Sequence, residues 1–277
     1  MAIRIVQSKQ NPRVKELRAA LLRPGRGESE LVALEGLHLV DEALRSGTHL
    51  QTIFVAQGHE NLLESLGAID ETQTEILAVP REILDSAVST ESPQPIAALA
   101  HPRNWPWAEV LAQKPDQSAL VVVLSGIQDP GNLGTILRSA EAFGATGILC
   151  LTGTVSRWNS KAMRASAGSV FRLPVLASSE AKAFQHLREA GIRTLAAMAR
   201  EAEPLNEADL TGPIALLIGS EGSGLSSEIA AQCDARITIP CPGPVESLNA
   251  AVAASVLLYE ASRQRRLREK IESEPNE

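Results

Sequence analysis

Aromatic residues are scarce in this chain: they make up 3% of its 277 residues. RNA-binding modules of the RRM and OB type stack bases on exposed aromatic rings, so this composition disfavours a platform of that kind. Long hydrophobic runs are also missing, because no apolar segment approaches the roughly 18–20 residues that a membrane-spanning helix needs. The N-terminal stretch lacks the apolar core of a signal peptide. We therefore expect a cytoplasmic protein with no membrane partner.

The sequence also lacks the patterns that hold metals or disulfides. Its three cysteines, Cys150, Cys233 and Cys241, are widely spaced and form no CxxC pair. Its five histidines form no HExxH or HxH pattern. We expect free thiols in a reducing compartment rather than disulfides, and no metal site.

The net charge of −7 argues against a general affinity for nucleic acids, but the charges are unevenly distributed. Residues 1–27 carry seven basic residues and one acidic residue, whereas residues 28–103 carry three basic and thirteen acidic residues. The basic segment is either a solvated helix face or an arm that contacts phosphates.

The length fits two domains of ordinary size. In residues 1–103, strand and helix patterns alternate, which predicts a small α/β domain. The predicted strands are 31–34, 50–55, 75–79 and 96–100, and the predicted helices are 13–22, 36–46, 61–67 and 81–89.

Residues 104–118 have the composition of a connector, whose Trp105 and Trp107 are expected to pack one domain on the other rather than stack on a base. Residues 119–277 predict a second α/β domain. Its continuous apolar runs, 119–124 and 214–218, suit strands buried on both faces of a parallel sheet.

Three loops of the second domain each follow a predicted strand, and in open α/β sheets ligands lie beyond the carboxyl ends of the strands. The first loop leads through Asp129-Pro130-Gly131 to Asn132, which we expect to cap the next helix. Arg138 lies off the apolar face of that helix, so it is either a solvated group or a functional one.

The second loop, 219–225, has three glycines that let the backbone approach a ligand closely. It is neither a Walker A loop nor a GxGxxG motif, which disfavours phosphate binding and leaves open a purine or ribose held by backbone amides. Glu221 within it suits hydroxyl groups or a cation.

In the third loop, Pro240, Pro242 and Pro244 fix a bend before a helix that starts near 247–249. Polar side chains there lie at a helix N-terminus, where acceptors and anions are favoured. This stretch alone is either an ordinary strand–turn–helix connection or a ligand site; the three loops together favour the ligand site.

The three loops resemble the signature motifs of the SpoU-type (TrmH-like) RNA ribose 2′-O-methyltransferases of the SPOUT superfamily. The matching stretches are 129–145 (DPGNLGTILRSAEAFGA), 216–226 (LLIGSEGSGLS) and 239–265, with 161–175 between them. The N-terminal half resembles the family's L30e-like substrate-binding domain at 11–22, 31–44 and 90–100. One small apolar departure is Cys241, where the family commonly has methionine.

The resemblance implies an L30e-like α/β domain over 1–103, a linker over 104–118, and an α/β methyltransferase domain with a trefoil knot over 119–277. It implies S-adenosyl-L-methionine as the cofactor. The residues that match the family's cofactor contacts are Gly219, Ile239 and Leu248. The residues that match its catalytic positions are Arg138 and, to orient it and the target ribose, Asn132, Glu221, Ser247 and Asn249. We expect Arg138 to position the hydroxyl group or to stabilise developing negative charge, because a guanidinium is a donor rather than a base.

The resemblance also implies a homodimer through the knot domain and an RNA substrate, with rRNA favoured because the match spans the two-domain form. The expected RNA contacts are Lys9, Arg13, Lys15, Arg18 and Arg164. The alternatives are a tRNA substrate, a non-catalytic RNA-binding protein with a degenerate knot, and an enzyme that methylates a base. The intact positions Asn132 and Arg138 weigh against the last two.

Overall fold

The computed structural model describes residues 2–22, 31–88, 93–113, 118–245 and 247–273. The chain divides into two compact units. Residues 1–104 and 156–172 make up the first unit, and residues 105–155 and 173–277 make up the second. Among the described helices, none combines the length and hydropathy that a membrane crossing requires.

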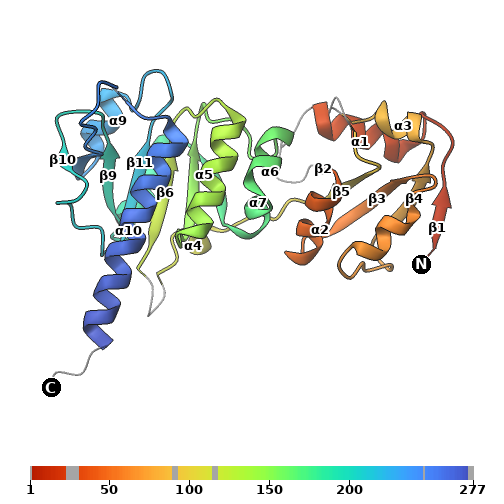
Figure 1. Ribbon diagram of the computed structural model, residues 1–277, viewed down its shortest axis with the longest axis horizontal. Coiled ribbons are helices and arrows are strands. Elements are labelled where there is room, and N and C mark those ends of the chain that lie inside the picture. The colour runs from red at the N-terminus through yellow and green to blue at the C-terminus, as the bar shows by residue number, and fades with distance from the viewer. Residues whose placement is uncertain (1, 23–30, 89–92, 114–117, 246, 274–277) are drawn as a thin grey trace. The chain divides into compact units, whose positions relative to one another are not determined.

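The first unit is built on a mixed five-stranded sheet (Figure 1). In spatial order its strands are β1 (Ile3–Ile5), β4 (Glu75–Val79), β3 (Leu50–Ala56), β5 (Ile96–Ala100) and β2 (Val32–Glu35). Strands β1, β4 and β3 are parallel, whereas β5 is antiparallel to both of its neighbours. The helices are α1 (Pro12–Leu22), α2 (Leu37–Arg45), α3 (Arg81–Asp85), α6 (Ser160–Ser166) and α7 (Ser169–Arg172), with a 3₁₀ helix, η1 (Glu60–Ser65).

The four strands predicted for this part of the chain are confirmed. The short helix predicted at 61–67 is present over Glu60–Ser65 and is a 3₁₀ helix. Strand β1 was missed because its three residues are all exposed and carry no burial pattern. Helix α1 packs through Val14 and Leu17 into a hydrophobic core with Phe54 and Leu77.

Residues 156–172 fold with the first unit, although in the sequence they follow residues 105–155 of the second unit. Helix α6 contacts β2, where Arg164 Nη1 lies 3.6 Å from Glu35 Oε2. Arg172 forms an ion pair with Glu42 on α2. The structural division therefore differs from the predicted limits at 103 and 119.

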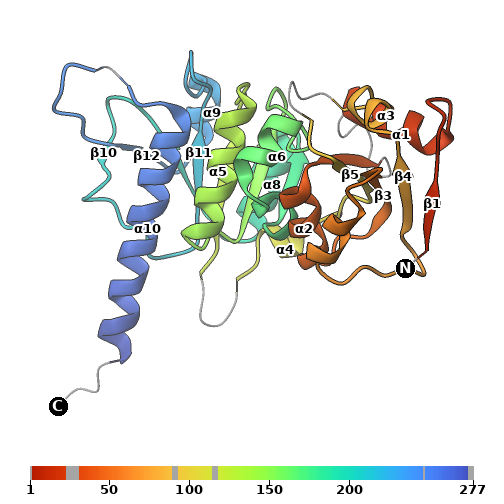
Figure 2. The same ribbon diagram turned by 45° about the vertical axis from the view of Figure 1, so that its right-hand side comes forward.

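The second unit is built on a seven-stranded parallel sheet (Figures 1 and 2). In spatial order its strands are β10 (Glu203–Pro204), β12 (Ala235–Thr238), β9 (Arg193–Ala197), β11 (Ile214–Ile218), β6 (Leu120–Leu124), β7 (Gly147–Leu151) and β8 (Val175–Ser178). All residues of β6 and β11 are buried, as the continuous apolar runs predicted for strands covered on both faces.

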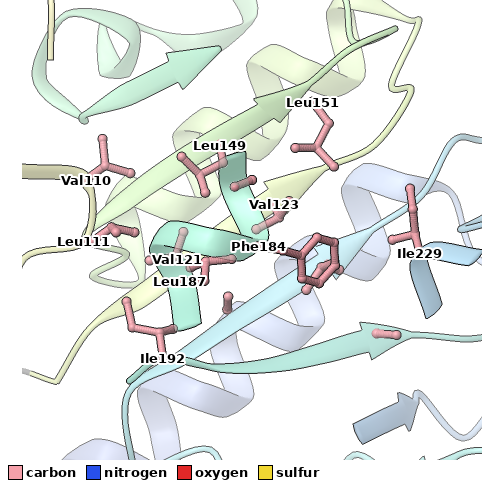
Figure 3. Close-up of a cluster of buried hydrophobic side chains, with 14 of the residues drawn as sticks. Val110, Leu111, Val121, Val123, Leu149, Leu151, Phe184, Leu187, Ile192 and Ile229 are labelled. Atoms are coloured by element: carbon pink, nitrogen blue, oxygen red, sulfur yellow. The ribbon is translucent and has the colours of Figure 1, made fainter. Parts of the chain in front are cut away.

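Helices cover both faces of this sheet. They are α4 (Trp107–Val110), α5 (Pro130–Ala142), α8 (Glu180–Glu189), α9 (Ser227–Gln232) and α10 (Ala250–Ser273). On one face, Phe184 and Leu187 of α8 and Ile229 of α9 pack on Val121 and Val123 of β6 (Figure 3). On the other, α5 and α10 lie side by side (Figures 1 and 2).

The two tryptophans of the predicted connector pack within the second unit. Trp105 is buried in the same hydrophobic cluster as Val110 and Leu111. The ring of Trp107 stacks on His186 of α8, with the ring centroids 4.1 Å apart. The two tryptophans therefore belong to the packing of the second unit.

Arg265 of α10 joins the C-terminal helix to the start of the sheet. Its Nε donates to the carbonyl oxygen of Leu210 (3.1 Å), Nη1 to that of Ser118 (2.7 Å), and Nη2 to those of Ala119 (2.9 Å) and Gly212 (2.7 Å). Burial lowers the pKa of Arg265 to about 10. These carbonyl groups precede β6 and β11, so one side chain ties the last helix to the entry of both central strands.

Candidate functional site

A cavity of about 340 Å³ lies beyond the carboxyl ends of β9, β11 and β12. The strand ends and the loops that follow β11 and β12 form its walls. The three residues predicted to hold the cofactor, Gly219, Ile239 and Leu248, all line it. A cavity of this size, with apolar side chains and a glycine-rich backbone, suits a small organic ligand.

Gly219 is at a point where no side chain fits. An added Cβ atom would lie 2.0 Å from the carbonyl carbon of Gly224 and 2.1 Å from the nitrogen of Leu225. The loop folds back here, since the N–H of Ser220 donates to Gly224 O (3.2 Å) and the N–H of Gly224 donates to Ser220 O (3.0 Å). The backbone itself therefore forms this wall of the cavity.

A chain of polar side chains joins the three predicted loops. Asn132 Nδ2 donates to Glu221 Oε1 at 2.7 Å, and Asn249 Nδ2 donates to Asn132 Oδ1 at 3.1 Å. The Oδ1 atom of Asn249 accepts from the N–H groups of Ala251 (2.9 Å) and Val252 (3.3 Å), which caps α10. Residues far apart in the sequence thus meet beside the cavity, which Glu221 lines.

The groups at the two ends of this hydrogen-bonded series, Glu221 and the backbone N–H groups of α10, determine which atom donates in each hydrogen bond. An ionised Glu221 only accepts, so Asn132 must present its amide nitrogen to it and its oxygen to Asn249. Backbone N–H groups only donate, so Asn249 must present its oxygen to them. Each amide nitrogen has two N–H groups, and one on each side chain remains for a substrate.

Glu221 carries the negative charge of this chain. Burial acts to raise the pKa of Glu221, but hydrogen bonds from Asn132 and from the backbone N–H groups of Glu221, Gln128 and Asp129 hold it below its ordinary value. The carboxylate is therefore ionised at neutral pH and orders the start of α5.

The prediction that Asn132 caps the helix was wrong. Asp129 is the cap, and its Oδ1 accepts from the N–H of Asn132 at 3.0 Å. Pro130 takes the first helical position, where its missing N–H costs nothing. The side chain of Asn132 is thereby left to bridge Glu221 and Asn249.

Residues 119–259 match the model of the SpoU rRNA Methylase family, and residues 11–98 match that of the MRM3-like substrate binding domain. The chain belongs to the SpoU rRNA methylase family. The family and the α/β fold predicted from the sequence are thereby confirmed, whereas the trefoil knot stays a prediction.

Relatives and solved structures of SpoU enzymes resemble the chain over most of its length. An uncharacterized tRNA/rRNA methyltransferase of Mycobacterium ulcerans is 36% identical, over 92% of this chain and 85% of the relative. A structure of an AdoMet-bound rRNA methyltransferase from Sinorhizobium meliloti has a TM-score of 0.82 at 30% identity, covering 94% of this chain and 98% of that one. A structure of an RNA 2′-O ribose methyltransferase has a TM-score of 0.75 at 31% identity, covering 95% and 99%.

Arg138 and Ser247 are placed differently relative to the cavity. Ser247 is exposed and lines the cavity. Arg138 is exposed on α5 and does not line it. Within the described part of the chain, Arg138 has no ion pair or side-chain hydrogen bond. Its guanidinium is therefore available to a molecule outside the subunit.

Helices α5 and α10 are in contact along their length. Beyond the Asn132–Asn249 bond, Ser139 Oγ lies 2.8 Å from Ser255 Oγ, and Phe143 meets Tyr259 edge to face with ring centroids 5.8 Å apart. Sequence reasoning missed the serine pair, since serine has no distinctive spacing in a helix. The contacts hold α5 in one register on α10.

The candidate RNA contacts have unequal surroundings. Lys9 and Lys15 are exposed. Arg13 donates to Glu16, Gln51 and Glu75. Arg18 donates to Ser86 and Arg164 pairs with Glu35. All five lie in the first unit, and their contact with RNA stays a prediction.

None of the three described cysteines forms a disulfide: Cys150 is buried, Cys233 is half-buried and Cys241 is exposed. Burial, helped by Asp234, raises the pKa of the Cys233 thiol to about 11. In the described ranges, no three His, Cys, Asp or Glu side chains gather into a group that suits a metal ion.

Proposed function

We propose that this SpoU methyltransferase transfers a methyl group from S-adenosylmethionine to a ribose 2′-hydroxyl of RNA, with rRNA as the substrate. The observation that carries the proposal is the Glu221–Asn132–Asn249 chain beside the cavity. It gathers residues from all three predicted loops and leaves amide donors for a ribose. The rRNA methyltransferase and RNA 2′-O ribose methyltransferase structures that the chain resembles support the same reaction.

The cavity fits the cofactor. S-adenosylmethionine supplies a methyl group on a positively charged sulfur. Ile239 and Leu248 offer apolar surface to its adenine, and the backbone around Gly219 comes close enough to contact it. The AdoMet-bound structure from Sinorhizobium meliloti supports this assignment.

The 2′-oxygen would form a bond to the methyl carbon as the carbon–sulfur bond breaks, which releases S-adenosylhomocysteine, and the hydroxyl proton would pass to water. The step needs the oxygen, the methyl carbon and the sulfur in line, and the developing charge on the oxygen stabilised. Asn132 and Asn249 would orient the ribose through their remaining N–H groups, with Ser247 adding a hydroxyl group. Arg138 would donate to the oxygen or to the neighbouring phosphate and stabilise negative charge as it develops.

We also propose that the protein acts as a homodimer through α5 and α10. Val252 and Tyr259 of α10 are each 49% exposed, on the side of the helix away from its buried residues. Arg138 is exposed on the neighbouring α5. A second copy would cover this apolar surface. Light scattering of Tyr259→Glu should then give half the mass of the wild type, and an unchanged mass would reject this interface.

The chemistry of RNA separates ribose methylation from base methylation. Wild-type protein, tritiated S-adenosylmethionine and protein-free rRNA are incubated, and the RNA is hydrolysed in alkali. A 2′-O-methyl group blocks attack on the adjacent phosphate, so we expect the label in alkali-stable dinucleotides. Label in mononucleotides would mean base methylation. If a parallel reaction labels tRNA strongly while rRNA stays unlabelled, tRNA is the substrate instead of rRNA.

Gly219→Ala is expected to abolish cofactor binding. The new Cβ would overlap the backbone at Gly224 and Leu225, so the loop must leave its position at the cavity wall. Isothermal titration with S-adenosylmethionine measures the effect. Gly222→Ala is the matched control, because nothing lies within 4 Å of the Cβ position there. Wild-type affinity in Gly219→Ala would contradict the cavity as the cofactor site.

A brief pulse of N-ethylmaleimide at pH 7 is expected to label Cys241 well before Cys233 or Cys150. Cys241 is exposed, whereas Cys150 is buried and the raised pKa of Cys233 leaves little thiolate. Because Cys241 lines the cavity, S-adenosylmethionine should slow its labelling. Peptide mass spectrometry reads both results. Protection should disappear in Gly219→Ala, and equal labelling with and without cofactor in the wild type would place the cofactor elsewhere.

A further inference from the structure

A second cavity, of about 390 Å³, lies at the opposite end of the strands that lead to the cofactor cavity. Strand β9 begins in it with Arg193 and ends at the cofactor cavity with Ala197. The residues before β12 also line it, whereas Ile237 within β12 lines the cofactor cavity. Residues in or next to β9 and β12 therefore line both cavities, but the cavities lie at opposite ends of these strands.

Two guanidinium groups line this second cavity. Arg188 comes from the end of α8 and Arg193 from the start of β9, and both are exposed. Within the described residues, neither side chain has a hydrogen bond or an ion pair. Hydrogen bonds from Thr194 and Thr211 are the main cause of the lowered pKa values of Asp234 and Asp209. The charge of Arg193 lowers both pKa values further, without an ion pair to either carboxylate. Two arginines with free donors in one cavity suit a phosphate group.

The lining also includes the carboxylate of Asp234, which is a hydrogen-bond acceptor, and an apolar wall. Asp234 Oδ2 accepts from the N–H and the hydroxyl group of Thr194, at 2.8 and 2.7 Å, and Oδ1 has no partner among the described residues. Phe184 and Ile192 form the apolar wall. Both also belong to the buried hydrophobic cluster shown in Figure 3. A ribose phosphate matches this set, because its phosphate would accept from the arginines and its hydroxyl would donate to Asp234.

We propose that Arg188, Arg193 and Asp234 bind a ribose phosphate of the RNA backbone, at a site separate from the cofactor cavity and from Arg138. This inference rests on the proposed function, since it takes the ligand from the RNA substrate. It gives the catalytic unit its own contact with RNA, whereas the candidate RNA contacts found from the sequence all lie in the first unit.

The experiment compares Arg188→Gln/Arg193→Gln with Lys182→Gln/Arg236→Gln in the full-length chain. Both variants lose two positive charges from the same unit, but Lys182 and Arg236 do not line the cavity. Filter binding to protein-free rRNA, without cofactor, gives the dissociation constant at several salt concentrations. We expect about a tenfold loss of affinity in the first variant, the scale of one charge-assisted hydrogen bond, and a salt dependence weaker by roughly one released counterion.

The control variant should keep its RNA affinity within about twofold, and both variants should bind S-adenosylmethionine as the wild type does. In methylation assays the first variant should show a raised KM for RNA and an unchanged kcat at saturating RNA. Equal losses in both variants, or no loss in the first, would overturn the proposal.

Uridine 5′-monophosphate tests whether the site binds the ribose phosphate of a free nucleotide instead of that of the RNA backbone. If titration shows that it binds the wild type and not Arg188→Gln/Arg193→Gln, while rRNA affinity is the same for both, the site takes a free nucleotide and the proposal fails. A wild-type protein that binds rRNA through these arginines but transfers no methyl group would leave this inference standing and reject the proposed function.

Discussion

Arg138→Ala should lower kcat for RNA methylation by about 10²–10³-fold, the scale of removing one donor from a charge that develops in a transition state. Arg138 is exposed on α5, has no partner in the described part of the subunit, and lies outside the lining of the cofactor cavity. Its removal should therefore leave the affinity for S-adenosylmethionine within about twofold of the wild type. Single-turnover methylation and isothermal titration measure the two quantities.

Two companion variants sharpen this test. Arg138→Lys keeps the charge but loses the planar fork of donors, so its kcat should fall between those of the wild type and Arg138→Ala. Arg236→Ala, also exposed and on the second unit, should keep wild-type kcat. Wild-type kcat in Arg138→Ala would refute the assigned role. A parallel loss of cofactor affinity would instead mean that the substitution disturbs α5.

Arg265→Met should destabilise the second unit by about 3–5 kcal/mol. The guanidinium donates to four backbone carbonyl groups at the entry of the sheet, and an apolar side chain would leave them without these donors. Each lost hydrogen bond to a charged group costs about 1.5–3 kcal/mol, and the four losses overlap. A thermal melt followed by circular dichroism should show a Tm lower by roughly 10 °C.

The neighbouring arginine gives a matched control. Arg266 is exposed, and among the described residues its side chain donates only to the carbonyl oxygen of Ser262 in the same helix, at 3.3 Å. Arg266→Met should therefore change stability by no more than about 0.5 kcal/mol. If Arg265→Met and Arg266→Met melt together with the wild type, the four hydrogen bonds contribute nothing measurable to stability.

Local patterns in the sequence predicted much of the fold. The apolar runs that became β6 and β11 are typical of strands buried on both faces. The apolar face expected for the helix that carries Arg138 is the buried face of α5, with Leu133, Ile136 and Leu137. Strand β10 has two residues and strand β1 is fully exposed, so neither has a hydrophobic pattern to detect. The fold of 156–172 with the first unit depends on partners such as Glu35 and Glu42, which are far away in sequence.

The sequence predicted the residues of the candidate site but not the contacts between them. The glycines and prolines of the three loops indicated a ligand, and the family resemblance supplied Asn132, Glu221 and Asn249. Their mutual hydrogen bonds were not predictable, because each joins positions at least 89 residues apart. Nothing in the sequence distinguishes Arg265 from the neighbouring arginines, and its half-buried position and its backbone partners are visible only in the structure.

The link between Arg265 and the entry of β6 also sets an order of assembly on the ribosome. Arg265 follows Ala119, one of its carbonyl partners, by 146 residues. At a synthesis rate of about 5–20 residues per second, the carbonyl groups before β6 wait roughly 7–30 s for this donor. A nascent chain therefore holds an unfinished sheet until α10 has been made. The N-terminus of the same helix holds Asn249 at the site. A nascent chain that has not yet reached α10 therefore lacks both the hydrogen bonds of Arg265 and the Asn249 side chain of the third loop.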